Sequence, residues 1–147
     1  MCYQCDKETT HSEVKGWALD RTAVVVQARM GSARFPGKVM LPLAGLPILN
    51  WVLLRLGKCI SADSLVVATS TSDSDDPIVD FCGKYGYLCY RGSEDDVLER
   101  FLAAAQWVGA DAVVRVTGDC PLIDPTVVDS MVSYFLESDL DYVSCVH

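Results

Sequence analysis

A ten-residue segment, residues 29 to 38, carries the side chains best suited to chemistry in this sequence. It reads Arg-Met-Gly-Ser-Ala-Arg-Phe-Pro-Gly-Lys and holds three of the twelve lysine and arginine residues, namely Arg29, Arg34 and Lys38. Gly31 and Gly37 let backbone N–H groups approach a ligand closely, and guanidinium groups bind phosphate through paired hydrogen bonds. The composition therefore indicates a phosphate-binding loop. A merely solvated basic loop is the alternative that the residues leave open.

The loop differs from two common phosphate-binding motifs. A P-loop needs Gly-x4-Gly-Lys-Ser/Thr at the start of a helix. Here Gly31 and Gly37 enclose five residues, and Val39 follows Lys38 in place of serine or threonine. Pro42 prevents an immediate helix. The dinucleotide fingerprint Gly-x-Gly-x-x-Gly is also missing from this segment. These differences argue against a kinase, a GTPase and an NAD-dependent enzyme.

A second loop, residues 117 to 124, supplies a carboxylate. Asp119 follows Gly118 and precedes Cys-Pro, so the backbone is expected to bend sharply with a charged group at its tip. Mg²⁺ takes oxygen ligands, bridges carboxylate and phosphate oxygens, and keeps several waters. We therefore expect Asp119 to hold Mg²⁺ opposite the basic loop, with a turn-capping aspartate as the alternative. Asp124, directly before Pro125, is more simply the N-cap of a helix.

Both loops follow segments that are expected to be strands. Short apolar runs, rich in β-branched residues and without polar alternation, are typical of strands buried on both faces. They span residues 23–28, 64–69, 87–90 and 112–116. A fifth strand is expected from Asp141 to Val146.

Helices are predicted between these strands by apolar residues at helical spacing and by proline or glycine at the helix ends. They begin at Pro47 and Pro77, cover residues 97–108, and begin again at Pro125. Ser93, with Asp96 three residues on, resembles a capping box for the third helix. Asp96 itself is also expected to cap that helix and to shape a base pocket only indirectly.

Five strands that alternate with four helices predict an α/β fold with a mostly parallel sheet. In such sheets the ligand crevice lies beyond the carboxyl ends of the strands, where the strand order reverses. That point usually falls between the first and fourth strands, so residues 29–38 and 117–124 are expected to face each other across it.

Composition narrows the class of protein. The net charge of −8 disfavours a nucleic-acid partner. The longest apolar run, residues 48–54, is too short to cross a membrane, and the acidic first twenty residues are unlike a secretory signal. Seven cysteines, an odd number without framework spacing, favour reduced thiols and a cytoplasmic protein.

The sequence divides at residue 22. Residues 1–22 are polar and without period, and we interpret them as an N-terminal extension; residues 23–147 form the expected nucleotide-binding α/β domain. Cys2 and Cys5 have the spacing of zinc ligands, but His11 is the only further candidate nearby, so a structural zinc is disfavoured.

Three ordered motifs carry a family resemblance. They run from Gln27 to Lys38, from Arg91 to Arg100 and from Arg115 to Pro125. Together they resemble the cytidylyltransferases of the spore coat polysaccharide biosynthesis protein F type. These are similar to the synthetases of CMP-3-deoxy-manno-octulosonate and CMP-N-acylneuraminate. The similarity runs from about Ala23 to the last residue.

The resemblance implies a three-layer Rossmann-like fold of the nucleotide-diphospho-sugar transferase type, of which this chain is the N-terminal part. It implies Mg²⁺-dependent transfer of CMP from CTP to a sugar, with release of pyrophosphate, for surface polysaccharide biosynthesis. A homodimer is also implied. By motif match the nucleotide would contact Ala28, Arg29, Met30, Gly31, Ser32, Arg34, Lys38, Arg91, Gly92, Ser93, Asp96 and Asp119. Arg29 and Lys38 would be catalytic, and Asp119 would hold the metal.

Other interpretations stay open at this point. Relatives of the family continue past residue 147, so the chain can also be a truncated, non-catalytic nucleotide-binding module that acts through self-association. A glycosyltransferase is a third possibility, because Asp73-Ser-Asp75 matches the Asp-x-Asp pattern of the metal-binding motif of these enzymes. Arg115 is expected either to pair with Asp119 or Glu94 or to contact the ligand.

Two further side-chain roles are expected. Glu94 and Asp95 are expected to favour the dipole of the following helix. Trp51 and Trp107 lie on apolar helical faces and are expected in the core.

Overall fold

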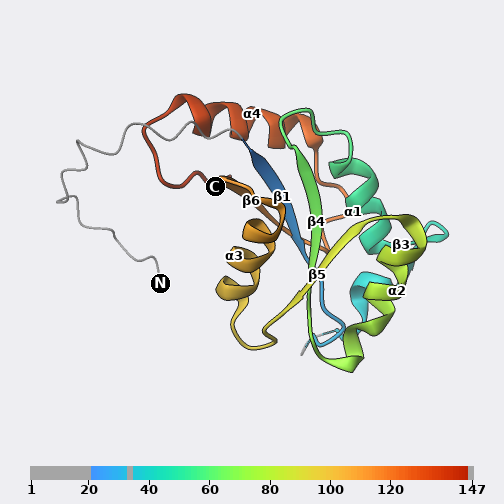
Figure 1. The fold of residues 1–147 in the computed structure, drawn as a ribbon. Coiled ribbons are helices and arrows are strands. Elements are labelled where there is room, and N and C mark those ends of the chain that lie inside the picture. Colours follow the sequence, from blue (N-terminus) through green and yellow to red (C-terminus); the bar gives the residue numbers. More distant parts are fainter. Residues whose placement is uncertain (1–20, 33–34, 146–147) are drawn as a thin grey trace.

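A four-stranded parallel sheet forms the centre of the molecule. The computed structural model describes residues 21–32 and 35–145. The strands are β1 (Thr22–Gln27), β4 (Ser64–Ser70), β5 (Leu88–Gly92) and β6 (Ala112–Thr117), in the order β5-β4-β1-β6 (Figure 1). β1 lies between two strands, and its residues 23–26 are fully buried. The prediction of a parallel sheet from β-branched runs is therefore confirmed.

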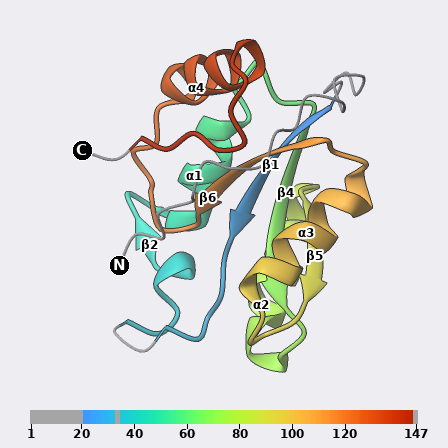
Figure 2. The same ribbon diagram turned by 90° about the vertical axis from the view of Figure 1, so that its left-hand side faces the viewer.

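Helices cover both faces of the sheet. The core on one face is formed by α1 (Ile48–Leu56), α2 (Asp76–Tyr85) and α4 (Pro125–Glu137), which pack on Val24, Val26 and Val67. α3 (Val97–Val108) packs on the other face against Val25 and Val66. Figure 2 shows α3 on one side of the sheet with α1 and α4 on the other. The expected three-layer arrangement is confirmed.

The connection from β1 to α1 contains a short hairpin. A 3-10 turn, η1 (Lys38–Met40), is followed by β2 (Pro42–Leu43) and β3 (Leu46–Pro47), which pair antiparallel. The indole N–H of Trp51 in α1 donates to the carbonyl of Leu43 at 2.7 Å and fixes the hairpin on the helix. The chain thus enters α1 only after Pro47, consistent with the expectation that Pro42 delays the helix.

The helix caps confirm two expectations and correct one. Asp124 caps α4 by accepting from the N–H of Thr126 at 2.9 Å. Asp96 caps α3 by accepting from the N–H of Glu99 at 2.8 Å. Ser93 is not the N-cap, because its hydroxyl accepts from the N–H of Asp96 and so shapes the turn before the helix.

Several further expectations need correction or fall outside the structure. Residues 141–145 form no strand, because they pair with no neighbouring strand and instead line a cavity of about 730 Å³ beside β6 and α4. Trp107 is 53% exposed and lies against Tyr90 rather than in the core, and Trp51 is only partly buried and belongs to neither core cluster. The N-terminal segment up to residue 20, with Cys2, Cys5 and His11, lies outside the described residues, and β1 begins at Thr22, one residue earlier than expected.

Candidate functional site

A cavity of about 400 Å³ lies at the carboxyl ends of β1 and β6. In the sheet order, the chain runs from β1 to β4 and β5 on one side and returns to β6 on the other, so the strand order reverses between β1 and β6. The predicted crevice is therefore present at the predicted place. The cavity is lined by Gln27, Arg29, Gly31, Ser32, Lys38, Val39, Thr117, Gly118 and Asp119.

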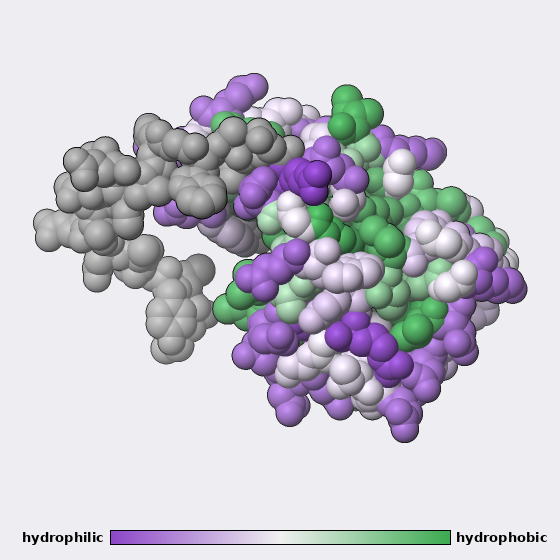
Figure 3. Space-filling model, viewed as in Figure 1, coloured by the Kyte–Doolittle hydropathy of each residue, from purple (hydrophilic) through white to green (hydrophobic). Residues whose placement is uncertain are grey.

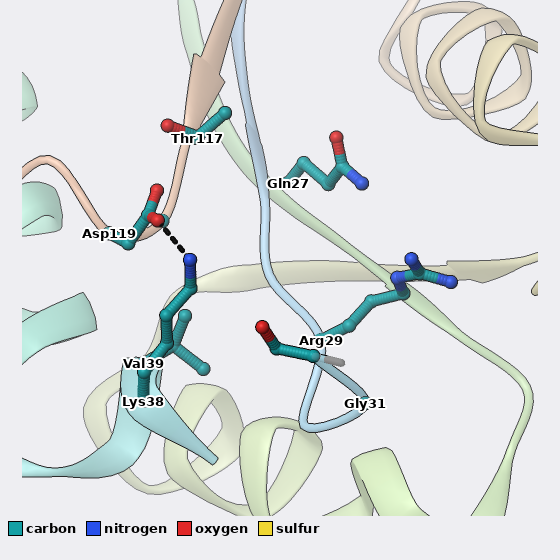
Figure 4. Close-up of a pocket in the computed structure, with 9 residues that line it drawn as sticks. Gln27, Arg29, Gly31, Lys38, Val39, Thr117 and Asp119 are labelled. Atoms are coloured by element: carbon teal, nitrogen blue, oxygen red, sulfur yellow. Dashed lines mark hydrogen bonds and ion pairs between the residues drawn. The ribbon is translucent and has the colours of Figure 1, made fainter. Parts of the chain in front are cut away.

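Lys38 and Asp119 meet across this cavity. The ammonium group of Lys38 forms a hydrogen-bonded ion pair with the carboxylate of Asp119, 81 residues further along the chain (Figure 4). The two side chains are 29% and 33% exposed, so both remain accessible to a ligand. The hydrogen bond from Lys38 holds the pKa of Asp119 below its ordinary value, and the hydroxyl of Thr117 adds to this effect. The carboxylate is therefore charged at neutral pH.

Gly118 allows the Asp119 loop to lie against β1. Its N–H donates to the carbonyl of Gln27 at 2.7 Å. A Cβ atom at residue 118 would lie 3.0 Å from that carbonyl oxygen and 3.2 Å from the Cβ of Ala28. Arg55 of α1 holds the other end of the loop by donating to the carbonyl of Ile123 at 2.5 Å. Close packing at one end and a hydrogen bond at the other thus place Asp119 opposite Lys38.

The basic loop is held at Met30. The N–H of Met30 donates to the Asp75 carboxylate at 2.7 Å, and its carbonyl accepts from the N–H of Gly37 at 2.8 Å. Gly37 has φ of 70°, a left-handed conformation that favours glycine. These contacts close the loop around Gly31 and Ser32, which line the cavity.

Arg29 lines the same cavity but its guanidinium group is directed elsewhere. It donates to the backbone carbonyl of Glu94 at 3.0 Å, and Figure 4 shows the side chain pointing away from Asp119. Of the two cations that line the cavity, Lys38 contacts the carboxylate of Asp119 and Arg29 does not. Ala28 is 1% exposed, and Arg34 lies outside the described residues.

Residues 91 to 96 lie beside the cavity rather than on its lining. The guanidinium group of Arg91 donates to the carbonyls of Ser70 and Ser72 and to the carboxylate of Asp76, at 3.0, 2.9 and 2.7 Å. Gly92 is buried, and a Cβ there would lie 3.0 Å from the side chain of Arg100. Of this segment, the carbonyl of Glu94 contacts Arg29, and none of Arg91, Gly92, Ser93 and Asp96 lines the cavity.

Sequence reasoning missed two buried charged residues that support these loops. Arg100 is fully buried; its Nη1 atom donates to the carbonyls of Ser93 and Glu94, and its Nε and Nη2 atoms have no hydrogen-bond partner. Burial lowers the pKa of Arg100, and the nearby charge of Arg29 lowers it further. The one signal in the sequence was an arginine next to the apolar Phe101 inside a helix.

The second missed residue is Asp75, which is 1% exposed. Besides the N–H of Met30, it accepts from the N–H and hydroxyl groups of Ser70 at 3.0 and 2.5 Å. Since both carboxylate oxygens have protein donors, Asp73-Ser-Asp75 does not present a metal motif to the cavity, which removes support from the glycosyltransferase interpretation.

Arg115 takes neither of its expected partners. Its guanidinium carbon lies 5.0 Å from the ring centroid of Phe101, and no ion pair joins it to Asp119 or Glu94 among the described residues. Its position between β6 and α3 is that of a cation stacked on an aromatic ring.

The oxygen donors of the cavity suit a magnesium ion only when a phosphate ligand supplies further oxygens. Among residues 21–32 and 35–145, no group of three or more histidine, cysteine, aspartate or glutamate side chains could hold a metal ion. Asp119 offers an ionised oxygen donor at a cationic cavity, and Mg²⁺ is commonly held by one or two carboxylates together with substrate phosphates. Asp119 therefore suits this mode of binding.

No membrane-crossing helix is found. Within the part of the chain that the structure describes, none combines the length and the apolar character that crossing a bilayer requires.

Comparisons with known proteins agree on one family. Residues 23–147 match the family model described as cytidylyltransferase. The spore coat polysaccharide biosynthesis protein SpsF of Bacillus subtilis is 38% identical over 122 residues, which cover 80% of this chain and 51% of that protein. The chain spans about half the length of the curated relatives it matches.

Two solved structures are similar over most of the chain. A cytidylyltransferase from Leptospira borgpetersenii superposes with a TM-score of 0.77 at 40% identity, over 81% of this chain and 50% of that one. A CMP:2-keto-3-deoxy-manno-octonic acid synthetase complexed with CTP superposes with a TM-score of 0.67 at 26% identity, over 78% of this chain and 47% of that one.

Proposed function

Because the chain belongs to the cytidylyltransferase family, we propose that it takes part in the transfer of CMP from CTP to a sugar hydroxyl, with release of pyrophosphate. The observation that carries the proposal is the contact of Lys38 with Asp119 across a cavity at the strand-order reversal. A cation and an ionised carboxylate at one cavity suit a triphosphate accompanied by Mg²⁺. A role in surface polysaccharide biosynthesis is part of the proposal, supported by the similarity to the Bacillus subtilis spore coat protein.

The proposed reaction needs charge stabilisation rather than a covalent nucleophile. When a sugar oxygen attacks the α-phosphorus, negative charge grows on the phosphate oxygens and on the leaving pyrophosphate. Lys38 would act as a fixed positive charge beside the leaving group, and Gly31 and Ser32 would present backbone N–H groups to the phosphates. A magnesium ion held by Asp119 would neutralise further negative charge on the phosphate oxygens.

Arg29 enters the reaction only after a side-chain rotation. Its guanidinium group now donates to the Glu94 carbonyl, in the segment beside the cavity. A rotation about its side-chain bonds would direct it to the triphosphate, where a guanidinium binds two oxygens at once. The bond to Glu94 is thus expected to break when nucleotide binds.

Nucleotide binding is the first test. Thermal unfolding is measured with CTP, UTP, ATP and GTP, each with and without Mg²⁺. A ligand at a hundred times its dissociation constant stabilises the folded state by ~2.7 kcal/mol, which shifts the midpoint visibly. We expect the largest shift with CTP and Mg²⁺. The absence of a shift with every nucleotide would contradict the proposal.

A second candidate is a nucleotide-binding module without turnover that acts through self-association. The position of β6 at the edge of the sheet favours this candidate, because an edge strand can pair with another chain. Pyrophosphate release from CTP in the presence of acidic sugars separates the two. Release supports the transferase, whereas CTP binding without release supports the module. For either function we propose a homodimer.

A further inference from the structure

Asp75 lies beneath the basic loop without lining the cavity. It belongs to η2 (Asp73–Asp75), the turn after β4, and its side chain is buried. Burial alone would raise its pKa, but hydrogen bonds from Ser70 and from the N–H of Met30 outweigh burial and leave the pKa below its ordinary value. A carboxylate that stays ionised in the interior has strong bonds to its donors. Asp75 is therefore a fixed acceptor on which the loop can be held.

The two oxygens of Asp75 serve different parts of the chain. Oδ2 accepts from the N–H and hydroxyl groups of Ser70 at 3.0 and 2.5 Å, within the same β4 to α2 connection. Oδ1 accepts from the N–H of Met30 at 2.7 Å, 45 residues earlier in the chain. One oxygen thus anchors Asp75 at the end of β4, and the other holds the basic loop.

Met30 stands between the residues that line the cavity. Arg29 precedes it, Gly31 and Ser32 follow it, and all three line the cavity. Because a peptide unit is planar, fixing the N–H of Met30 also fixes the orientation of the carbonyl of Arg29. The direction in which the loop presents its N–H groups and the Arg29 side chain therefore depends on the bond to Asp75.

We propose that Asp75 is the positioning residue of the basic loop: its carboxylate holds the N–H of Met30 and so keeps Arg29, Gly31 and Ser32 in the geometry that receives a triphosphate. The inference rests on the proposed function. Asp75 touches no phosphate and acts only through the backbone of Met30.

Asp75→Asn tests this role, and Ser70→Ala is its matched control. Asparagine has nearly the same shape, but it has one acceptor oxygen and an NH₂ group, so it cannot accept at both ends. Ser70→Ala removes a donor from the other oxygen and leaves the bond to Met30. An asparagine oxygen that faces Ser70 keeps two hydrogen bonds, so the NH₂ group is expected to face the N–H of Met30 and that bond is lost, whereas Ser70→Ala leaves it in place.

Binding of Mg²⁺-tripolyphosphate and of CTP with Mg²⁺ is measured by calorimetry at a temperature at which each variant is folded. We expect the dissociation constants of Asp75→Asn to rise at least tenfold for both ligands, and those of Ser70→Ala to rise less than threefold. If the two variants lose affinity equally, or if Asp75→Asn binds like wild type, the proposal is wrong.

Hydrogen exchange provides a second measurement that needs no ligand. In the wild-type protein the Met30 amide is expected to exchange as slowly as amides of β1, and Asp75→Asn is expected to speed it at least tenfold while Val25 stays protected. Rapid exchange of Met30 in wild type would overturn the proposal even if Asp75→Asn fails to fold.

The two measurements also separate this proposal from the proposed function. If wild type binds neither tripolyphosphate nor CTP, the proposed function fails, and a slow Met30 amide still supports Asp75 as the holder of the loop. If wild type binds both ligands and Met30 exchanges freely, the proposed function stands and Asp75 is not the positioning residue.

Discussion

At the scale of single residues, Lys38 carries the first prediction. It is the cation in contact with Asp119, and it lies where the leaving pyrophosphate is expected. Lys38→Ala is expected to lower turnover at least a hundredfold, because a fixed charge at the leaving group acts mainly in the transition state. Pyrophosphate release measures the rate, and circular dichroism checks that the fold survives. Lys58→Ala, at an exposed lysine beyond α1, is the control. Near-normal turnover in Lys38→Ala would remove Lys38 from the mechanism.

The ion pair between Lys38 and Asp119 also predicts a pH dependence. The folded-state pKa of Asp119 is lowered, so the pair contributes stability above the unfolded-state pKa of about 3.9, and this contribution is lost as the pH falls through the lower folded value. Since both side chains are about a third exposed, we expect the contribution to be only about 0.5 kcal/mol. Titration of the Asp119 carboxyl by NMR should give a higher pKa in Lys38→Met than in wild type. An equal pKa in both proteins would contradict the pairing.

The residues found from the sequence and those missed differ in how they are positioned. Lys38 and Asp119 each follow a predicted strand, so local sequence was enough to place them at one edge of the sheet. Asp75 and Arg100 are charged residues that became buried because other segments cover them, and only the tertiary structure supplies their partners. Arg29 lines the predicted cavity, but its bond to the Glu94 carbonyl, 65 residues away in the chain, was not foreseen.

At the scale of elements, the contact between β1 and the loop after β6 leaves little room for a larger side chain at Gly118. Gly118→Ala is expected to destabilise the protein by about 1–3 kcal/mol, because its Cβ would press on the Gln27 carbonyl oxygen, a backbone atom that cannot turn aside. It is also expected to weaken nucleotide binding by displacing Asp119. Thermal unfolding and the CTP-induced shift measure the two effects.

Gly83→Ala is the matched control for that substitution. Gly83 lies inside α2, and a Cβ there would meet no atom within 4 Å. Alanine favours helix by about 0.5–1 kcal/mol over glycine, so this variant should be more stable than wild type with unchanged CTP binding. If Gly118→Ala behaves like Gly83→Ala, the loop is not packed against β1 as described.

Elements were predictable where a local pattern matched a buried environment. The β-branched runs of β1, β4 and β6 and the terminal prolines and glycines of the helices indicated their type without tertiary information. The β2–β3 hairpin was not foreseen, because its strands of two residues each carry no periodicity and depend on Trp51 of α1. Residues 141–145 have the composition of a strand but no neighbour to pair with.

At the scale of the whole molecule, β6 forms an edge of the sheet. Val113 on this strand is 44% exposed, and the cavity between β6 and α4 is lined mainly by apolar residues, among them Val114, Val116, Val128, Val132 and Phe135. Figure 3 shows both hydrophobic and hydrophilic residues on one face of the molecule. Open edge strands next to apolar surface favour association with another chain.

The homodimer proposed above can be tested at this edge. Light scattering over a range of protein concentrations is expected to show dimers for wild type and monomers for Val113→Lys, because a lysine on an edge strand opposes strand pairing. Val127→Lys, at a residue of α4 that is similarly exposed at 45%, is the control and should remain dimeric. A wild-type protein that stays monomeric at every concentration would contradict the proposal.

The overall architecture followed from the sequence because parallel α/β sheets obey strong rules of connection and handedness. Alternating strands and helices were enough to predict the layers and the place of the cavity. The pairing of side chains inside that cavity requires segments up to 81 residues apart in the chain to be placed with the precision of a hydrogen bond. This placement is determined by tertiary packing, which a local sequence pattern does not predict.

One backbone oxygen links the loop after β1 with helix α3. The carbonyl of Glu94 accepts from Arg29 on the β1 side and from the buried Arg100 on the α3 side. If Arg29 leaves this acceptor for an incoming anion, the carbonyl of Glu94 retains the hydrogen bond from Arg100. Under the proposed function, binding of the phosphates would thereby change the hydrogen bonds of a segment that the family resemblance assigns to the nucleotide.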